Sequence, residues 1–258
     1  MLLAHIRAGV GNRLFQYASV KGLARRQGFD MRVASLEFDH EHGDHHQWFL
    51  EAIQKNCDFS LRPRMMYMQP DQDHVGVPTT QTFEDMTLLH GYYQFEENFS
   101  HIADELRLEF SESERVSKKL DTFGLDWSKC WAVHIRLGDY LRNQKHFVNL
   151  TKYYLECLGE IPKDATVLII CEDHANIPRV YPMVHEELQK RTLFQIPIGS
   201  DELDLYALSR CSGVICSNST FAWWGAWLGR PKKVYLPNKW FRDDSRHVPM
   251  KGAVLKEV

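Results

Sequence analysis

Several patterns that mark whole classes of protein are missing from this sequence of 258 residues. No window approaches the roughly 20 apolar residues that a membrane-spanning helix needs. The apolar start, Met1 to Ala4, is too short for a signal peptide, so we expect a cytoplasmic protein or one domain of a longer chain. The formal net charge is -3 with histidine neutral, which argues against a surface that holds nucleic acid by general attraction.

Two nucleotide-binding motifs and the spacing of a cysteine metal site are also absent. The turn Gly9 to Gly11 is not the dinucleotide motif G-x-G-x-x-G, because position 14 is leucine, and no P-loop motif G-x-x-x-x-G-K-[ST] occurs. The six cysteines form no C-x-x-C pair. We therefore expect buried free thiols, and neither a dehydrogenase nor a P-loop enzyme.

The sequence does contain a regular alternation of apolar strands and helices. A strand is expected at 2–8, a tight turn at 8–12, a helix at 14–27, a further strand from 88 and a charged amphipathic helix at 111–123, whereas 37–82 shows no clear pattern. After a linker at 124–130, strands are expected at 131–136, 166–171, 192–196, 213–216 and 233–236, and helices at 151–160, 201–210 and 219–228. Continuous apolar strands separated by helices predict an α/β fold with a parallel sheet, and the linker predicts domains at 1–124 and 125–258.

The stretch WAVHIRLGDY, Trp131 to Tyr140, carries an imidazole, a guanidinium and a carboxylate to the end of an apolar strand. Ligands of open parallel sheets bind outside the carboxyl ends of the strands, which is where His134, Arg136 and Asp139 are expected. Arg136 is either a structural ion-pair partner or a group that grips phosphate oxygens through two parallel hydrogen bonds.

A second stretch, GVICSNSTFAWWGAWL, runs from a strand through hydroxyl and amide side chains into an apolar helix. The N–H groups at a helix N-terminus bind phosphate, although Ser219 or Thr220 could also serve only as the N-cap. Together with Arg136, this turn favours a diphosphate site. The three tryptophans of the helix have near-helical spacing, which is more typical of a core than of a sugar-binding surface.

Two weaker signals stand at other strand ends. Glu172 and Asp173 follow the strand at 166–171, where a carboxylate can accept hydrogen bonds from guanine or ribose, or can cap the next helix. Gly9 and Gly11 allow the backbone to approach a ligand closely, and Asn12 would project from that turn.

The run DHEHGDHH, Asp39 to His46, holds four histidines and three carboxylates and invites a metal hypothesis. Metal ligands are normally held by rigid elements, whereas this run is loop-like and far in sequence from the other signals. A solvated loop is therefore favoured, and no metal ligand is predicted.

Four segments, in order along nearly the whole chain, resemble the inverting α-1,2-fucosyltransferases of family GT11. AGVGNRLFQYA is similar to the family's G-x-G-N-Q-x-F-Q-Y-A opening, and HGYYQFEENF to its G-Y-x-Q-x-x-x-x-F segment. HIRLGDY resembles the H-x-R-R-G-D signature, and SNSTFAWWGAWL the S-N-S-S-F-S-W-W-G-A-W-L block. The last match is highly specific, and the ordered set is stronger than any single segment.

This resemblance implies a GT-B-like fold of two Rossmann-type domains facing across a cleft, the first on the acceptor side and the second binding the GDP-sugar. It implies transfer of L-fucose from GDP-β-L-fucose to a glycan hydroxyl with inversion, in an α-1,2 linkage and without a required metal. The partners would be the GDP-sugar and the glycan acceptor. Peripheral membrane association through the acceptor and the oligomeric state stay open.

The resemblance also assigns roles by position. Arg136 is expected to contact the diphosphate, and Asp139 either accepts the acceptor's proton, with Glu96 and Glu97 as further candidates, or holds Arg136 in place. The donor-binding residues are expected to be Asn12, Arg13, His134, Glu172, Asp173, Ser217, Asn218, Ser219, Thr220 and Phe221. The acceptor-side residues are expected to be Tyr92, Gln94 and Glu96.

The chain departs from the family pattern at two positions. The second arginine of the signature is Leu137 here, and the glutamine after Asn12 is Arg13. We hypothesise that Arg13 restores the lost positive charge from the opposing domain. Acceptor preference is expected to lie in 37–82, which the resemblance does not cover. The alternatives are a related transferase with another GDP-sugar or linkage, a non-catalytic nucleotide- or glycan-binding relative and, more remotely, a metal-dependent hydrolase.

Overall fold

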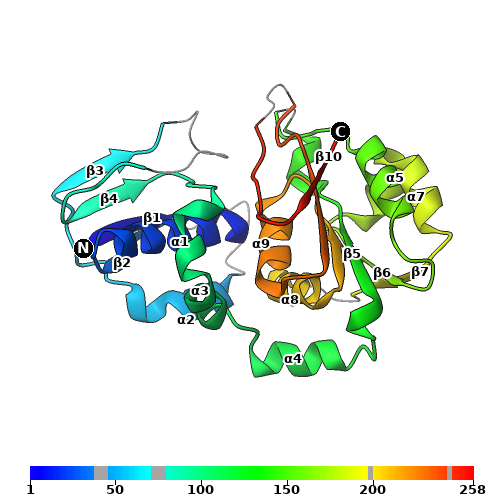
Figure 1. Ribbon diagram of the computed structural model, residues 1–258, viewed down its shortest axis with the longest axis horizontal. Coiled ribbons are helices and arrows are strands. Elements are labelled where there is room, and N and C mark those ends of the chain that lie inside the picture. The colour runs from blue at the N-terminus through cyan, green and yellow to red at the C-terminus, as the bar shows by residue number, and fades with distance from the viewer. Residues whose placement is uncertain (38–45, 71–79, 144, 197–199, 243–245) are drawn as a thin grey trace. The chain divides into compact units, whose positions relative to one another are not determined.

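The computed structural model describes residues 1–37, 46–70, 80–143, 145–196, 200–242 and 246–258. The chain divides into two compact units, Met1–Ser111 and Glu112–Val258. Each unit contains a sheet whose described strands all pair in parallel, with helices packed on it (Figure 1). The predicted α/β fold is therefore confirmed, and it is built twice.

The first unit has the strand order β2-β1-β4-β3. Its strands are β1 (Leu2–Ile6), β2 (Met31–Leu36), β3 (Met65–Met68) and β4 (Thr87–His90), and its helices are α1 (Val10–Arg26), α2 (Gln47–Ile53) and α3 (Ala103–Glu109). Short 3-10 turns lie at Gln54–Asn56, Glu96–Asn98 and Ser100–Ile102. β1 is buried along its whole length because strands flank it on both sides and α1 packs against it.

The second unit has the strand order β10-β9-β8-β5-β6-β7. Its strands are β5 (Cys130–His134), β6 (Thr166–Ile170), β7 (Thr192–Gln195), β8 (Gly213–Ile215), β9 (Lys233–Pro237) and β10 (Val254–Lys256). Its helices are α4 (Glu114–Asp121), α5 (Thr151–Gly159), α6 (Ile177–Val180), α7 (Pro182–Leu188), α8 (Asp201–Arg210) and α9 (Thr220–Gly229). Every strand and helix predicted after residue 130 is present, with ends shifted by only a residue or two.

The division between the units falls before α4, whereas the sequence placed the linker at 124–130. α4 packs against α8 of the second unit. Arg210 at the end of α8 holds the segment in place, because it donates to Glu112 at 2.7 Å and to Asp121 at 2.6 Å. The amphipathic helix expected at 111–123 therefore belongs to the second unit.

α1 begins at Val10, so the expected start at Leu14 is wrong. The chain reverses at Ala8, whose φ is 65°, while Gly9 is extended at φ -65° and caps the helix N-terminus. Asn12 and Arg13 consequently lie in the first turn of α1 and not in a glycine loop.

The burial of tryptophan and cysteine side chains bears on two smaller predictions. Trp223, Trp224 and Trp227 are at most 3% exposed and pack their rings against one another, so they belong to the core. All six cysteines are free thiols, and Cys57 is the one that is not fully buried.

Candidate functional site

The carboxyl ends of three neighbouring strands, β6, β5 and β8, meet at one edge of the second sheet. β5 and β8 are buried throughout, which explains why their sequences are continuous apolar runs. The residues that end or follow these strands are polar: His134 and Arg136 after β5, Glu172 after β6 and Ser217 after β8. The fold therefore brings these predicted residues to one edge, as ligand-binding parallel sheets require.

Arg136 lies among two carboxylates and an aromatic ring. Its Nη2 donates to Oδ1 of Asp139 at 2.6 Å, and its Nε lies 3.5 Å from Oε1 of Glu172. The guanidinium carbon is 5.4 Å from the centre of the Tyr140 ring, a cation–π distance. The Arg136 side chain is only 24% exposed, so its charge is held in a fixed position close to the sheet edge.

Glu172 fixes the turn that carries Arg136. Its Oε1 accepts a hydrogen bond from the backbone N–H of Leu137 at 2.9 Å. Gly138 permits this approach, since a Cβ there would lie 2.6 Å from the same oxygen. Burial raises the pKa of Glu172, and the charge of Arg136 opposes that rise. Glu172 thus has a structural task here, and its contact with a nucleotide stays a prediction.

Leu137, which replaces the family's second arginine, is fully buried in the hydrophobic core of the second unit. The substitution therefore places an apolar side chain among core residues and away from the ion-pair cluster. Asp139 is 41% exposed and bound to Arg136, so the alternative that it holds the arginine in place has direct geometric support.

His134 and Ser217 form the buried part of the site. Nδ1 of His134 lies 2.8 Å from Oγ of Ser217, and the Phe221 ring is 5.8 Å away, centre to centre. Burial, assisted by the charge of Arg136, lowers the pKa of His134 to about 3, so the imidazole is neutral at pH 7. Because Nδ1 is paired with Ser217, the orientation of the neutral ring is fixed, and its Nε2 can form a hydrogen bond to a flat polar ligand such as a nucleobase.

The turn before α9 is held by side chains and leaves helix N–H groups for a ligand. The side-chain amide of Asn218 donates to the backbone carbonyl oxygens of His146 and Trp240 at 3.0 and 2.8 Å, and the backbone carbonyl of Asn218 accepts from the Tyr140 hydroxyl at 3.1 Å. Ser219 is the N-cap, its side chain makes no capping hydrogen bond, and Thr220 begins the helix. Because first-turn N–H groups have no partner inside a helix, this end suits an anion.

Tyr140 links the two halves of this edge and was missed by the sequence reasoning, although it closes the HIRLGDY segment. It stands against Arg136 and donates to the turn that contains Asn218. Asp173, in contrast, accepts from Asn176 at 2.7 Å, and no described contact connects it to the Arg136 cluster.

The first unit has its own polar edge, at the carboxyl ends of β1 and β4. Nε2 of Gln94 donates to Oδ1 of Asn12 at 2.7 Å, so a predicted acceptor-side residue meets a predicted donor-binding one. The guanidinium carbon of Arg7 lies 4.9 Å from the centre of the Tyr92 ring. Glu96 starts the 3-10 turn Glu96–Asn98.

Arg13 is 2% exposed and bonds to the backbone of its own unit. Its Nε donates to the carbonyl oxygen of Ala8 at 2.6 Å, and its Nη2 to that of Glu37 at 3.4 Å. These contacts give Arg13 a structural role at the β1–α1 turn, and its compensation for Leu137 stays a prediction.

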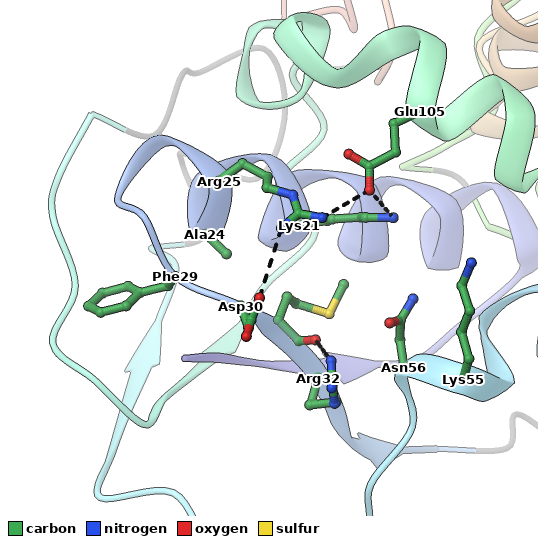
Figure 2. Close-up of a pocket in the computed structure, with 10 residues that line it drawn as sticks. Lys21, Ala24, Arg25, Phe29, Asp30, Arg32, Lys55, Asn56 and Glu105 are labelled. Carbon is green, nitrogen blue, oxygen red and sulfur yellow. Dashed lines mark hydrogen bonds and ion pairs between the residues drawn. The ribbon is translucent and has the colours of Figure 1, made fainter.

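A cavity of about 170 Å³ lies at the opposite end of the first sheet, where α1 ends and β2 begins (Figure 2). Its wall includes four cationic side chains, those of Lys21, Arg25, Arg32 and Lys55. Two of them are engaged by Glu105, which lies 2.9 Å from Lys21 and 3.2 Å from Arg25.

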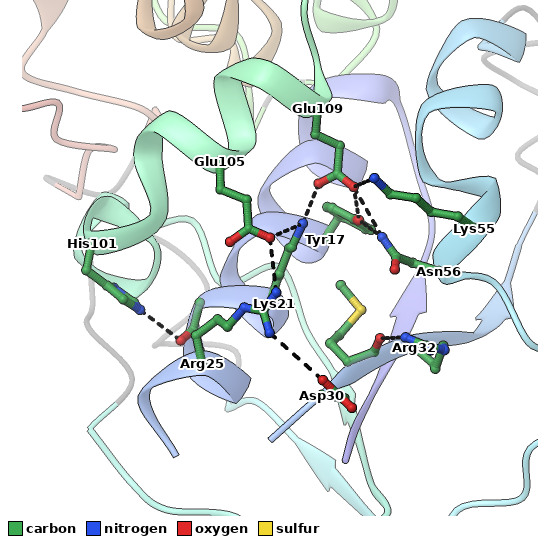
Figure 3. Close-up of polar contacts among 12 residues, drawn as sticks. Tyr17, Lys21, Arg25, Asp30, Arg32, Lys55, Asn56, His101, Glu105 and Glu109 are labelled. Carbon is green, nitrogen blue, oxygen red and sulfur yellow. Dashed lines mark hydrogen bonds and ion pairs between the residues drawn. The ribbon is translucent and has the colours of Figure 1, made fainter. Parts of the chain in front are cut away.

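Behind this cavity, a buried network joins α3 to α1 (Figure 3). Nζ of Lys21 donates to Glu109 at 2.6 Å, and the Tyr17 hydroxyl donates to the other oxygen of that carboxylate at 2.8 Å. Asn56 adds a third hydrogen bond to Glu109 at 3.1 Å. Each oxygen of the Glu109 carboxylate thus accepts a hydrogen bond, which indicates that the network has a structural role in holding the two helices together.

Among the described residues, no three His, Cys, Asp or Glu side chains gather in a way that could hold a metal ion. Residues 39–45 of the histidine-rich run lie outside the described residues. No helix in the described part of the chain is long and apolar enough to cross a bilayer.

Solved structures with a similar fold include the following two. The fold matches fucosyltransferase NodZ from Bradyrhizobium with a TM-score of 0.54 and 14% identity, over 90% of this chain and 94% of that one. It matches POFUT1 in complex with GDP with a TM-score of 0.55 and 12% identity, over 91% and 97% of the two chains. The two parallel sheets are therefore arranged as in a GT-B-like fold, and the structural class of the chain is that of GT-B-like α/β proteins.

The chain belongs to glycosyl transferase family 11, whose model matches residues 45–257. An α-1,2-colitosyltransferase from Escherichia coli is 23% identical over 93% of this chain and 92% of its own length. The O-antigen biosynthesis glycosyltransferase WbnK from Escherichia coli is 28% identical over 45% of this chain, and the match spans 40% of WbnK. The resemblance to family GT11 is thereby confirmed.

Proposed function

We propose that this chain transfers L-fucose from GDP-β-L-fucose to a hydroxyl of a glycan acceptor, with inversion and an α-1,2 linkage. The observation that carries the proposal is the fixed guanidinium of Arg136, joined through Tyr140 to the turn before α9. Cleavage of the sugar–phosphate bond places negative charge on the departing GDP. A guanidinium and the N–H groups of a helix N-terminus stabilise such charge without a proton transfer.

Because this chain supplies cationic and N–H groups at the edge, the proposed reaction needs no divalent ion. A cytoplasmic location is a separate part of the proposal. Activity that survives EDTA, together with recovery of the protein in the cytosolic fraction, would support these two parts. A non-catalytic relative would instead bind GDP without releasing it from a GDP-sugar.

A second donor is favoured by one observation, the match of nearly the whole chain to an α-1,2-colitosyltransferase. Colitose is fucose without its 3-hydroxyl, so both sugars would present the same diphosphate to Arg136. Comparing kcat/KM for GDP-fucose, GDP-colitose and GDP-mannose separates the two candidates and tests the alternative of another GDP-sugar.

Calorimetric titration of GDP, with and without EDTA, tests the site directly. Wild type should bind GDP equally in both buffers. Arg136→Ala should weaken binding roughly 10- to 100-fold, since a hydrogen bond to a charged group contributes about 1.5–3 kcal/mol. The matched control is Arg142→Ala, an exposed arginine just after the same turn, which should bind like wild type. Failure of folded wild type to bind GDP would overturn the proposal.

A further inference from the structure

The cavity at the end of α1 lies wholly within the first unit, and the proposed transfer reaction does not use it. All of its lining residues belong to Met1–Ser111. Its cationic side chains come from three different elements: Lys21 and Arg25 from α1, Arg32 from β2, and Lys55 from the 3-10 turn Gln54–Asn56 (Figure 2). With a volume of about 170 Å³, the cavity has room for several water molecules or for a small ion.

Two of these four cations have a carboxylate at close range. Nζ of Lys21 is 2.6 Å from Oε2 of Glu109, and Nη2 of Arg25 is 3.2 Å from Oε1 of Glu105. Glu109 belongs to the buried network behind the cavity, so its charge is compensated there (Figure 3). Asp30, the other carboxylate of the lining, is 73% exposed and lies 3.9 Å from Arg25, so water weakens its effect on the cavity.

Arg32 and Lys55 are the cations of the cavity with the weakest compensation. Among the described residues, no carboxylate forms an ion pair with the half-buried Arg32, and its hydrogen bond to the carbonyl oxygen of Met31, at 2.9 Å, uses only one of its N–H groups. Asp58 feels the charge of Arg32 from farther away. Lys55 is 73% exposed and lies 3.7 Å from Glu109, a long distance for an ion pair. A half-buried guanidinium without a close counter-ion favours the binding of an anion.

The backbone beside the cavity opposes an anion less than its position suggests. α1 ends here, and the carbonyl groups at the end of a helix carry partial negative charge. Two of these carbonyl oxygens accept hydrogen bonds from the turn that follows α1: that of Ala24 from Gln27 and Phe29, and that of Arg25 from Gly28. Since their charge is partly compensated by these N–H groups, the cationic side chains determine which ligands the cavity favours.

We propose that this cavity is a second anion site, which binds a phosphate group through Arg32 and Lys55, with Arg25 and Lys21 beside them. Cations on several sides match a tetrahedral anion whose oxygens point in several directions, whereas a flat carboxylate presents both oxygens on one side. Inorganic phosphate and the headgroup of phosphatidic acid present the same chemistry. The inference does not depend on the function proposed above, because Arg136 and its neighbours belong to the second unit.

The first test is calorimetric titration of inorganic phosphate at an ionic strength held constant with sodium chloride. The protein carries Arg136→Ala, because the second unit also offers phosphate an arginine. One phosphate should bind per chain, and Arg32→Gln should weaken its binding roughly 10- to 100-fold, as expected for the loss of a hydrogen bond to a charged group. The control is Arg62→Gln, at an exposed arginine of the same unit outside the cavity, which should leave binding unchanged.

The second test uses a variant that should gain affinity. Oε1 of Glu105 lies 2.9 Å from Lys21 and 3.2 Å from Arg25, so Glu105→Gln removes the charge that engages both cations. Phosphate should then bind several-fold more tightly, a result that a partly unfolded variant cannot produce. Glu51→Gln, the same change at an exposed glutamate of α2, should bind phosphate with unchanged affinity.

A third titration compares acetate, free phosphate and phosphatidylcholine vesicles with and without phosphatidic acid. Tight binding of free phosphate assigns the site to a soluble anion, whereas binding only to vesicles that contain phosphatidic acid, lost in Arg32→Gln, assigns it to a lipid headgroup. The inference is overturned if neither source of phosphate binds, if acetate binds as tightly as phosphate, or if Arg32→Gln and Glu105→Gln both bind like their controls. Each of these results leaves the proposed function standing, because that function is tested by GDP binding at Arg136.

Discussion

Replacing Lys21 with methionine should destabilise the protein through the buried network between α1 and α3. The Lys21 side chain is 10% exposed and that of Glu109 is 4% exposed, so Lys21→Met leaves a buried carboxylate without its closest cation. Breaking such a pair costs about 3–5 kcal/mol. Tyr17 and Asn56 continue to donate to Glu109, which places the expected loss near the lower limit, about 3 kcal/mol.

Urea unfolding, monitored by circular dichroism, measures this loss as a change in the free energy of unfolding. The control is Arg25→Met, whose side chain is 48% exposed and whose ion pairs should contribute at most about 1 kcal/mol. Adding Glu109→Gln to Lys21→Met should restore part of the stability, because the uncompensated charge disappears. Equal losses in Lys21→Met and Arg25→Met would refute the view that this pair is buried and coupled.

Three further predictions concern the second unit. Gly138→Ala should lower the free energy of unfolding by about 1–3 kcal/mol and weaken GDP binding, because the added Cβ displaces Glu172. Gly159→Ala is the control and should be neutral in the same unfolding and titration assays, because nothing lies within 4 Å of its added Cβ. Leu137→Arg, which restores the family signature, should lower the midpoint of thermal unfolding and not raise activity, since the site is fully buried. The pKa of His134 is about 3 in the folded protein and near 6.5 in the unfolded chain, so its contribution to the free energy of unfolding is full above pH 6.5. That free energy should decline from pH 6.5 toward pH 3 by at most about 1.4 kcal/mol per pH unit, and His134→Asn should flatten the slope between pH 7 and 5.

The second unit could be predicted well because its central strands, β5, β6 and β8, are almost entirely buried. Such strands are continuous apolar runs, and the polar residues that end them are visible directly in the sequence. The neighbour relations of β5, β6 and β8 then place His134, Arg136, Glu172 and Ser217 on one edge.

The first unit was harder to predict, because several of its strands have no distinctive sequence pattern and some of its contacts depend on how the strands pair. β2 and β3 lie at or near the segment without clear pattern, and β3 is only four residues long and largely exposed, so its apolar residues are not those of a buried strand. Glu37 is an ordinary surface residue in sequence, and only the pairing of β1 with β2 brings it to His5.

The left-handed turn at Ala8 is coupled to the departure at position 13. Ala8 adopts a left-handed conformation that residues with a Cβ avoid, at a cost of about 1–3 kcal/mol, and Nε of Arg13 donates to its carbonyl oxygen at 2.6 Å. A glutamine at position 13, as in the family pattern, has no guanidinium with which to make this contact. The residue that departs from the family pattern is therefore also the one that supports a strained backbone turn at the start of α1.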